Sequence, residues 1–252
     1  MKPETIFFRM FYFFLCKFNL VFSSFLFLIG SQFITFFSFP LPLPVKIRKR
    51  FRENLLMWFA RFINSINLNI HFYKKNIYQE NFKKPAMIIS NHVSVIDTPL
   101  ILSLTSKLVI ITNDWIIRSK FTWLLKKYSN FCMIDDNIEL SMNYLKEKIQ
   151  DGYSILIFPE GATSPYKIKR FHKGAFLMAE QLKLDILPLL IVASGEFLGK
   201  ESFFKYPGKI HLTLLQRITP ENESFGQGFS NRTKEICAFY RDEYKKLSSK
   251  PL

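Results

Sequence analysis

The chain has 252 residues, of which 48% are hydrophobic and 17% aromatic, and its formal net charge is +15. This length favours one domain, and so basic a surface suits either nucleic acid or anionic lipid. Thirteen of the 29 phenylalanines lie in residues 1–39, and no nucleic-acid-binding motif is present, which favours membrane lipid over nucleic acid.

The three cysteines, Cys16, Cys132 and Cys237, are far apart and odd in number. No Cys-x-x-Cys pair occurs, so the sequence predicts neither a metal site nor a disulfide framework. A reducing, cytosol-facing location fits this cysteine content.

Residues 1–45 are predicted to form a hydrophobic helical membrane anchor. Arg9 and Lys17 interrupt the apolar sequence, which leaves residues 18–39, a stretch just long enough to cross a bilayer. A signal peptide fits poorly because the apolar region is too long and no small-residue cleavage pattern follows. A single span and a helical hairpin within one leaflet both remain open.

Pro40, Pro42 and Pro44 end this segment and form a stiff connector. Residues 46–52 then carry five positive charges in seven positions. Beside an apolar segment this indicates the cytoplasmic side of a membrane, although an ordinary solvated basic face is the alternative. We therefore expect residues 46–252 to form a cytoplasmic domain.

Strand and helix patterns alternate through that domain, which predicts an α/β fold with a mixed, mostly parallel central sheet flanked by helices. Predicted strands cover residues 68–73, 87–89, 108–112, 131–134, 155–158, 184–192 and 210–215, and predicted helices cover residues 55–66, 140–150 and 231–248. Pro188 lacks a backbone N–H, so its strand is expected to lie at an edge or to contain a bulge.

A polar turn follows the apolar strand at residues 87–89, and it contains Asn91, His92 and, five positions later, Asp97. Residues five apart differ by roughly 140° around a helix, so His92 and Asp97 cannot share one helical face. They meet if His92 lies in the turn and Asp97 lies near the start of the next helix, where Asp97 fixes the imidazole tautomer. An unrelated loop histidine and helix N-cap are the alternative.

A second polar turn, Pro159-Glu160-Gly161, follows the predicted strand at residues 155–158. In open α/β sheets, ligands bind beyond the carboxyl ends of the strands. Two strands that deliver polar turns to the same edge therefore predict a site there.

The two turns together resemble the signatures of the glycerolipid acyltransferase family, which includes 1-acylglycerol-3-phosphate acyltransferases and related lysophospholipid acyltransferases. The first signature is Asn-His, four residues and Asp, here Asn91-His92 to Asp97, and the third is Phe-Pro-Glu-Gly, here residues 158–161. The resemblance covers about residues 70–195. It implies a membrane-bound enzyme of phospholipid biosynthesis, with an N-terminal helix pair that favours the hairpin reading.

The resemblance also implies the chemistry: transfer of a fatty acyl group from acyl-carrier protein or coenzyme A to the hydroxyl of a lysophospholipid such as 1-acylglycerol-3-phosphate. His92 is the expected general base, and Asp97 orients it. The residues expected to bind substrate are Asn91, Glu160, Gly161, Thr163, Arg170 and Lys173. No cofactor is expected beyond the acyl donor, and the implied location is the cytoplasmic face of a bacterial inner membrane.

Two departures from the family pattern concern positive charge. In the family, the second signature helps to bind the phosphate of the acceptor and normally ends in an arginine after a strand. Here Asp135 and Asp136 stand at that place, and Arg118 and Lys120 lie off the motif position. The third commonly continues Thr-Arg-Ser, but Thr163 occupies the arginine position. Positive charge could be supplied there instead by four downstream residues, Lys167, Lys169, Arg170 and Lys173. The alternatives are therefore a different acceptor, such as an aminolipid or a glycan-linked lipid, a non-catalytic lipid-binding homologue, and a thioester hydrolase.

Overall fold

In the computed structural model, the chain divides into two compact units. The described residues are 44–66, 70–94, 96–112, 128–134, 138–194 and 208–249, with scattered positions between Phe7 and Gly30. The first unit comprises Met1–Phe72, Thr98–Ser106 and Ala193–Ile210, and the second comprises Tyr73–Asp97, Lys107–Val192 and His211–Leu252.

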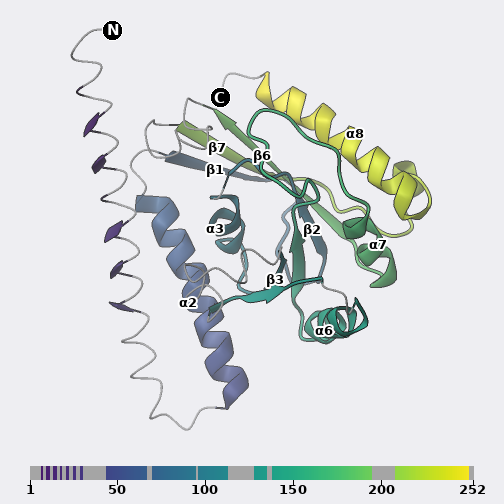
Figure 1. Ribbon diagram of the computed structural model, residues 1–252, viewed down its shortest axis with the longest axis horizontal. Coiled ribbons are helices and arrows are strands. Elements are labelled where there is room, and N and C mark those ends of the chain that lie inside the picture. Colours follow the sequence, from purple (N-terminus) through teal and green to yellow (C-terminus); the bar gives the residue numbers. More distant parts are fainter. Residues whose placement is uncertain are drawn as a thin grey trace. The chain divides into compact units, whose positions relative to one another are not determined.

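Within the described residues, one seven-stranded sheet runs in the order β1-β7-β6-β2-β5-β3-β4 (Figure 1). The strands are β1 (Ile70–Asn76), β2 (Met87–Ser90), β3 (Leu108–Ile111), β4 (Asn130–Cys132), β5 (Ser154–Ile157), β6 (Ile186–Ser194) and β7 (Gly208–Leu214). Strand β2 lies at the centre and pairs in parallel with β5 and β6. The carboxyl ends of β2 and β5 therefore reach the same edge of the sheet.

The helices are α2 (Val45–Ile66), α3 (Asp97–Leu102), α6 (Ile138–Gln150), α7 (Gly174–Gln181) and α8 (Gly228–Ser248), with a 3-10 turn at Glu223–Phe225. In the second unit α6 contacts β5, α7 contacts β2, and α7 packs against α8. The predicted fold class is confirmed for the mixed, mostly parallel sheet and its flanking helices. The basic residues predicted to follow the connector lie in the first turns of α2.

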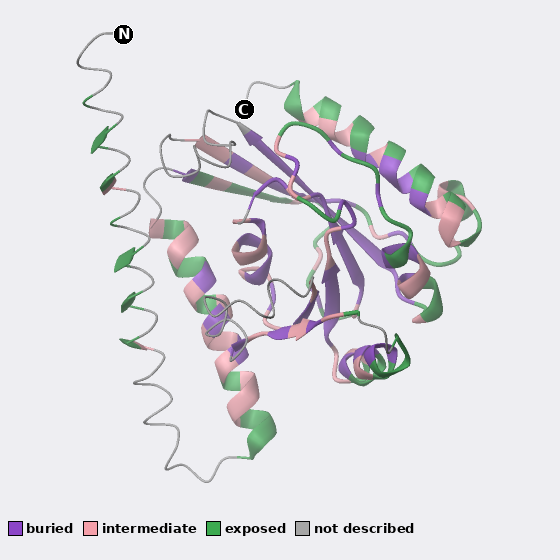
Figure 2. Ribbon diagram, in the orientation of Figure 1, coloured by how far each residue is buried: buried purple, intermediate pink, exposed green. Residues whose placement is uncertain are grey.

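The core of the second unit is formed where the central strands meet α7 and α8. Every residue of β2 is fully buried, as Figure 2 shows by its colour. Such a strand reads as a continuous apolar sequence because helices cover both faces of a parallel sheet. The hydroxyl group of Tyr240 in α8 donates a hydrogen bond to the carbonyl of Ile89 at 2.6 Å. This bond attaches α8 to the next-to-last residue of β2.

The predicted anchor over residues 1–45 lies mostly outside the described residues. In the described part of the chain, no helix combines the length and the apolar character needed to cross a membrane.

The expectation for Pro188 is corrected in one respect, because β6 is an interior strand rather than an edge. Pro188 pairs with Ile89 of β2, and its carbonyl accepts a hydrogen bond from the N–H of Leu215 at 3.0 Å. The N–H and C=O of a strand residue point to the same side, so the missing N–H falls toward β7, whose regular pairing has ended at Leu214. An interior position therefore costs no regular ladder hydrogen bond.

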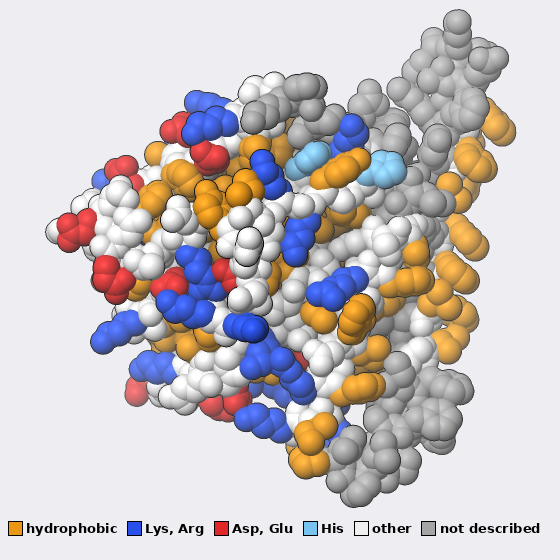
Figure 3. Space-filling view, turned by 180° about the vertical axis from the view of Figure 1, so that it is seen from behind, with side chains coloured by type: hydrophobic (Ala, Val, Ile, Leu, Met, Phe, Trp, Pro, Cys, Tyr) orange, Lys and Arg blue, Asp and Glu red, His pale blue; other side chains and the backbone are white. Residues whose placement is uncertain are grey.

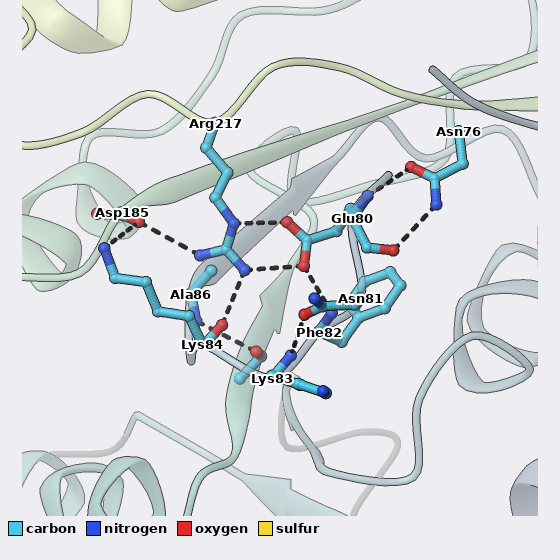
Figure 4. Close-up of polar contacts among 10 residues, drawn as sticks. Asn76, Glu80, Asn81, Phe82, Lys83, Lys84, Ala86, Asp185 and Arg217 are labelled. Atoms are coloured by element: carbon cyan, nitrogen blue, oxygen red, sulfur yellow. Dashed lines mark hydrogen bonds and ion pairs between the residues drawn. The ribbon is translucent and has the colours of Figure 1, made fainter. Parts of the chain in front are cut away.

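An ion-pair cluster lies at the amino end of β2 (Figure 4). Arg217 donates two hydrogen bonds to Glu80, at 2.5 and 3.0 Å, and one to Asp185 at 3.3 Å. Lys84 pairs with Asp185 at 2.7 Å. Burial raises the pKa of Glu80, but the hydrogen bonds and positive charge of Arg217 outweigh it and hold the pKa below its usual value. The cluster joins the β1–β2 connection to the start of β6 and to the segment that follows β7.

Replacing Arg217 with Met is expected to lower the free energy of unfolding by about 3 kcal/mol, because the nearly buried carboxylate of Glu80 loses its ion-pair partner, while Asp185 keeps Lys84. Urea denaturation followed by circular dichroism measures this, with Lys234→Met on the exposed face of α8 as the matched control. The folded pKa of Glu80 is depressed, so its contribution is complete above the ordinary carboxyl pKa of 4.5 and is lost as pH falls through the folded pKa. A difference between wild type and variant that persists unchanged at pH 3 contradicts this account.

Candidate active site

The turn after β2 is held to β6 by the side chain of Asn91. Its amide oxygen accepts a hydrogen bond from the N–H of Ile191 at 2.8 Å, and its amide nitrogen donates to the carbonyl of the same residue at 2.9 Å. Asn91 is fully buried. This geometry gives Asn91 a role in positioning the His92 turn, while direct contact between Asn91 and substrate stays a prediction.

His92 and Asp97 lie together in the arrangement that their spacing requires. His92 is in the turn, Asp97 is the first residue of α3, and 2.8 Å separates Nδ1 of His92 from Oδ2 of Asp97. The same carboxylate oxygen accepts hydrogen bonds from the N–H groups of Val93 at 2.6 Å and Ser94 at 2.8 Å. The chain thus wraps around one carboxylate, which fixes the imidazole orientation.

The surroundings of the pair differ at its two ends. The Asp97 side chain is fully buried, whereas 21% of the His92 side chain is exposed. Burial raises the pKa of Asp97, and hydrogen bonds from His92, Ser94 and Val93 oppose the rise. Since Nδ1 is occupied by Asp97, Nε2 is the nitrogen that remains to take a proton from a bound group.

The ring of Phe158 covers one face of the imidazole. The two rings stack with centroids 4.3 Å apart and planes inclined by 24°. Phe158 directly follows β5, so the parallel pairing of β2 with β5 places it beside His92. This contact restricts the ring of His92 from a second direction.

Glu160 connects the two turns through the backbone. One carboxylate oxygen accepts from the N–H of His92 at 3.0 Å, and the other accepts from the N–H of Lys169 at 2.9 Å. Glu160 is 5% exposed. Burial raises its pKa, and the N–H groups of Lys169 and His92 oppose the rise. Glu160 therefore braces the turn that carries His92, whatever contact it makes with substrate.

Gly161 occupies a position that suits only glycine. Its φ of +69° is in the left-handed region, and a Cβ there would lie 3.2 Å from Nε2 of His172. The N–H of His172 donates to the carbonyl of Pro159 at 2.8 Å. His172 thus packs against the Gly161 turn.

The segment after Gly161 is tied to the His92 turn and rich in positive charge. The N–H of Ser164 donates to the carbonyl of His92 at 2.6 Å. Thr163 is half-buried, and its carbonyl accepts from the ammonium group of Lys169 at 3.0 Å. Arg170 and Lys173 are exposed, and among the described contacts neither joins the hydrogen-bonded set around His92.

Several residues discussed from the sequence lie outside the described part of the chain. Arg118, Lys120 and the acidic pair at positions 135 and 136 belong to this group. In the part of the chain that the structure describes, Cys132 and Cys237 are buried, and neither forms a disulfide bond.

Three contributions to the site have no signal in the local sequence. They are the Phe158 ring on His92, the Glu160 bridge between backbone N–H groups 9 and 68 residues away, and the approach of Lys169 to Thr163. Pairing the ends of the two predicted strands would have brought Phe158 to His92. The others depend on the path of residues 161–169, which no periodicity indicates.

A histidine oriented by a buried carboxylate at the carboxyl end of a parallel strand defines the class of protein, an α/β enzyme with a histidine–aspartate pair. Residues 69–192 match the family model described as Acyltransferase. A 1-acyl-sn-glycerol-3-phosphate acyltransferase of Chlamydomonas reinhardtii is 26% identical over 164 residues, which are 61% of this chain and 49% of the relative. One from Helicobacter pylori is 30% identical over 81 residues, 31% of this chain and 34% of the relative.

Among solved structures, the 1-acyl-sn-glycerophosphate (LPA) acyltransferase PlsC from Thermotoga maritima has a TM-score of 0.78 and 18% sequence identity. The match covers 97% of this chain and 99% of that chain, and at this identity it shows a shared fold. Residues 69–192 thus carry the acyltransferase domain of this family, and the chain is similar to 1-acyl-sn-glycerol-3-phosphate acyltransferases. It spans about half the length of the algal relative that it matches.

Proposed function

We propose that the chain transfers a fatty acyl group from a thioester to the free hydroxyl of a lysophospholipid, with 1-acylglycerol-3-phosphate as the acceptor. The contact of 2.8 Å between His92 Nδ1 and Asp97 Oδ2 carries this proposal, because it leaves Nε2 as a base at the carboxyl end of β2. The curated relatives are named for this reaction, which supports the choice of acceptor. The acyl donor is acyl-carrier protein or coenzyme A thioester.

The chemical steps need only a proton carrier and an oxyanion site. Nε2 of His92 takes the hydroxyl proton as the hydroxyl oxygen attacks the thioester carbonyl carbon, and Asp97 stabilises the imidazolium. The tetrahedral intermediate collapses, the carbon–sulfur bond breaks, and the imidazolium returns the proton to the leaving thiolate. Backbone N–H groups of the two turns are the expected donors to the oxyanion.

A labelled acyl donor, offered with and without lysophospholipid, tests the proposal. Transfer predicts labelled diacyl lipid that forms only when the acceptor is present. Loss of thioester without acylated lipid would make the chain a hydrolase. Lipid binding without turnover would make it a non-catalytic homologue.

A different acceptor is the second candidate, and the residue at position 163 favours it. The family commonly has arginine there, whereas Thr163 donates a single neutral hydrogen bond. An aminolipid or a glycan-linked lipid needs no arginine at that position. Both candidates use the same His92 chemistry and differ only in the acceptor.

Association with a membrane surface is part of the proposal, and helix α2 supports it. Ile47, Phe51, Trp58 and Phe62 are between 45% and 61% exposed. They share one face of α2, roughly opposite the buried Leu56 and Ala60. Most of the described apolar residues between Phe7 and Ile29 are exposed as well.

Positive charge accompanies these apolar side chains. Figure 3 shows Lys and Arg side chains among exposed hydrophobic ones on one face. An apolar stripe with basic residues beside it suits the interface of an anionic bilayer. We propose that α2 lies against the cytoplasmic face of a bacterial inner membrane, together with the residues that precede it.

The double substitution Trp58→Glu with Phe62→Glu is expected to weaken binding of the full chain to anionic vesicles about tenfold or more, because two aromatic contacts with the bilayer are lost. Co-sedimentation with vesicles measures this. Tyr78→Glu, which alters another exposed aromatic residue, is the control. Equal binding of all three proteins would show that this face of α2 does not contact lipid.

A further inference from the structure

In this chain, a positive charge lies beside the position that commonly holds an arginine in this family. Thr163 occupies it, and the ammonium group of Lys169 lies 3.0 Å from the Thr163 carbonyl oxygen. An ammonium group has three N–H donors, so two remain after this bond. The side chain of Lys169, six residues downstream, therefore brings a positive charge to position 163, where the arginine of the family is missing.

The backbone of Lys169 is fixed to the active site and to α8. Its N–H donates to Glu160, whose other oxygen accepts from the N–H of His92. Its carbonyl accepts from the thiol of Cys237 at 3.4 Å, and the carbonyl of Ile168 accepts from Arg241 at 3.4 Å. A side chain that starts from an immobilised backbone is placed at lower entropic cost than one on a free loop.

The charge of Lys169 acts on the site as well as on Thr163. It lowers the pKa of Glu160, although burial, the larger effect, raises that pKa overall. Lys169 is itself exposed, so a ligand can reach its ammonium group. The sequence suggests four residues for this role, and all four are exposed, but the bond to Thr163 singles out Lys169 from Lys167, Arg170 and Lys173.

We propose that Lys169 binds the phosphate group of the acceptor and so replaces the missing arginine. This proposal rests on the proposed function. Lysine binds phosphate as a point charge, without the paired geometry of arginine. The phosphate would lie near Thr163, beside the turn that Glu160 joins to His92, and this would place the acceptor within the active site.

The test compares two acceptors that differ only in phosphate, 1-acylglycerol-3-phosphate and 1-acylglycerol. In the variant Lys169→Gln, kcat/KM for the phosphorylated acceptor is expected to fall roughly 10- to 100-fold, because a hydrogen bond to a charged group is lost. The kcat/KM for 1-acylglycerol and the KM for the acyl donor are expected to stay unchanged. Lys234→Gln, an exposed lysine of α8, is the control.

Two further variants separate charge from structure. Lys169→Arg keeps the positive charge and is expected to retain most of the preference for phosphate. The double variant Lys169→Gln with Thr163→Arg restores the arginine of the family pattern and is expected to recover that preference. A structural role for Lys169 would not be rescued by an arginine at position 163.

Equilibrium binding of both acceptors to the full chain gives a readout without turnover, with the same fall expected only for the phosphorylated one. An unchanged ratio between the two acceptors overturns the assignment of Lys169. An equal loss for both, or a rise only in the KM of coenzyme A thioester, overturns it too and points to structure or to donor phosphate. Absence of transfer by the wild type overturns the proposed function, while the binding ratio still decides the role of Lys169.

Discussion

Replacing His92 with Ala is expected to reduce acyl transfer by roughly 10²- to 10⁴-fold, the range that general-base catalysis contributes. The variant loses the imidazole that takes the hydroxyl proton in the proposed mechanism. The fold is expected to persist, because His92 lies in a turn with 21% of its side chain exposed. Initial rates at saturating donor and acceptor measure the effect.

His71→Ala is the matched control, since His71 is an exposed histidine in β1. Circular dichroism spectra of both variants should coincide with that of the wild type. Transfer by the His92 variant within tenfold of the wild-type rate would remove His92 from the role of base.

Replacing Asp97 with Asn is expected to lower kcat by about 10²-fold or more with little loss of stability. The amide oxygen of Asn accepts the hydrogen bonds from His92, Val93 and Ser94, but it carries no charge to stabilise the imidazolium. Asp97→Ala is expected to lose activity and also to destabilise the fold by about 2 to 4 kcal/mol, because the N–H groups of Val93 and Ser94 lose their acceptor. Urea denaturation and steady-state rates of the two variants measure these effects.

The comparison of the two Asp97 variants separates charge from structure. An Asn variant with kcat within threefold of the wild type would show that the carboxylate charge plays no part in catalysis. An Ala variant as stable as the wild type would show that the hydrogen bonds to Val93 and Ser94 do not hold the turn.

The strands and the histidine–aspartate pair were predictable from the sequence because both depend on short-range patterns. Residues 87–89 form an uninterrupted apolar sequence, and the five-residue spacing admits a contact only between a turn and a helix start. The structure has His92 in the turn and Asp97 at the start of α3. Local chemistry thus defined the centre of the site.

The surroundings of the pair were not predictable, because they join residues that are distant in the chain. Asn91 bonds to Ile191, 100 residues away, and Glu160 bonds to the N–H of His92, 68 residues away. No local pattern indicates either partner. The loop that carries Lys169 also has distant partners, since its backbone carbonyls accept hydrogen bonds from Cys237 and Arg241 of α8.

Pro188 illustrates how tertiary structure overrides a local rule. A missing N–H normally excludes proline from interior strands. Here the side of β6 that lacks the donor faces the point where β7 ends, so the interior position is tolerated. The end of a neighbouring strand is not visible in the residues around Pro188.

The central claim is that His92 serves a reaction whose acceptor is 1-acylglycerol-3-phosphate. Its most direct test offers labelled acyl-carrier protein and acyl-coenzyme A thioesters separately to the purified full chain in anionic vesicles. Each donor is paired with 1-acylglycerol-3-phosphate and, in parallel, with a total lysolipid extract. We expect labelled phosphatidate from 1-acylglycerol-3-phosphate with at least one donor. Labelled product from the extract alone would contradict it and assign the same chemistry to a different acceptor.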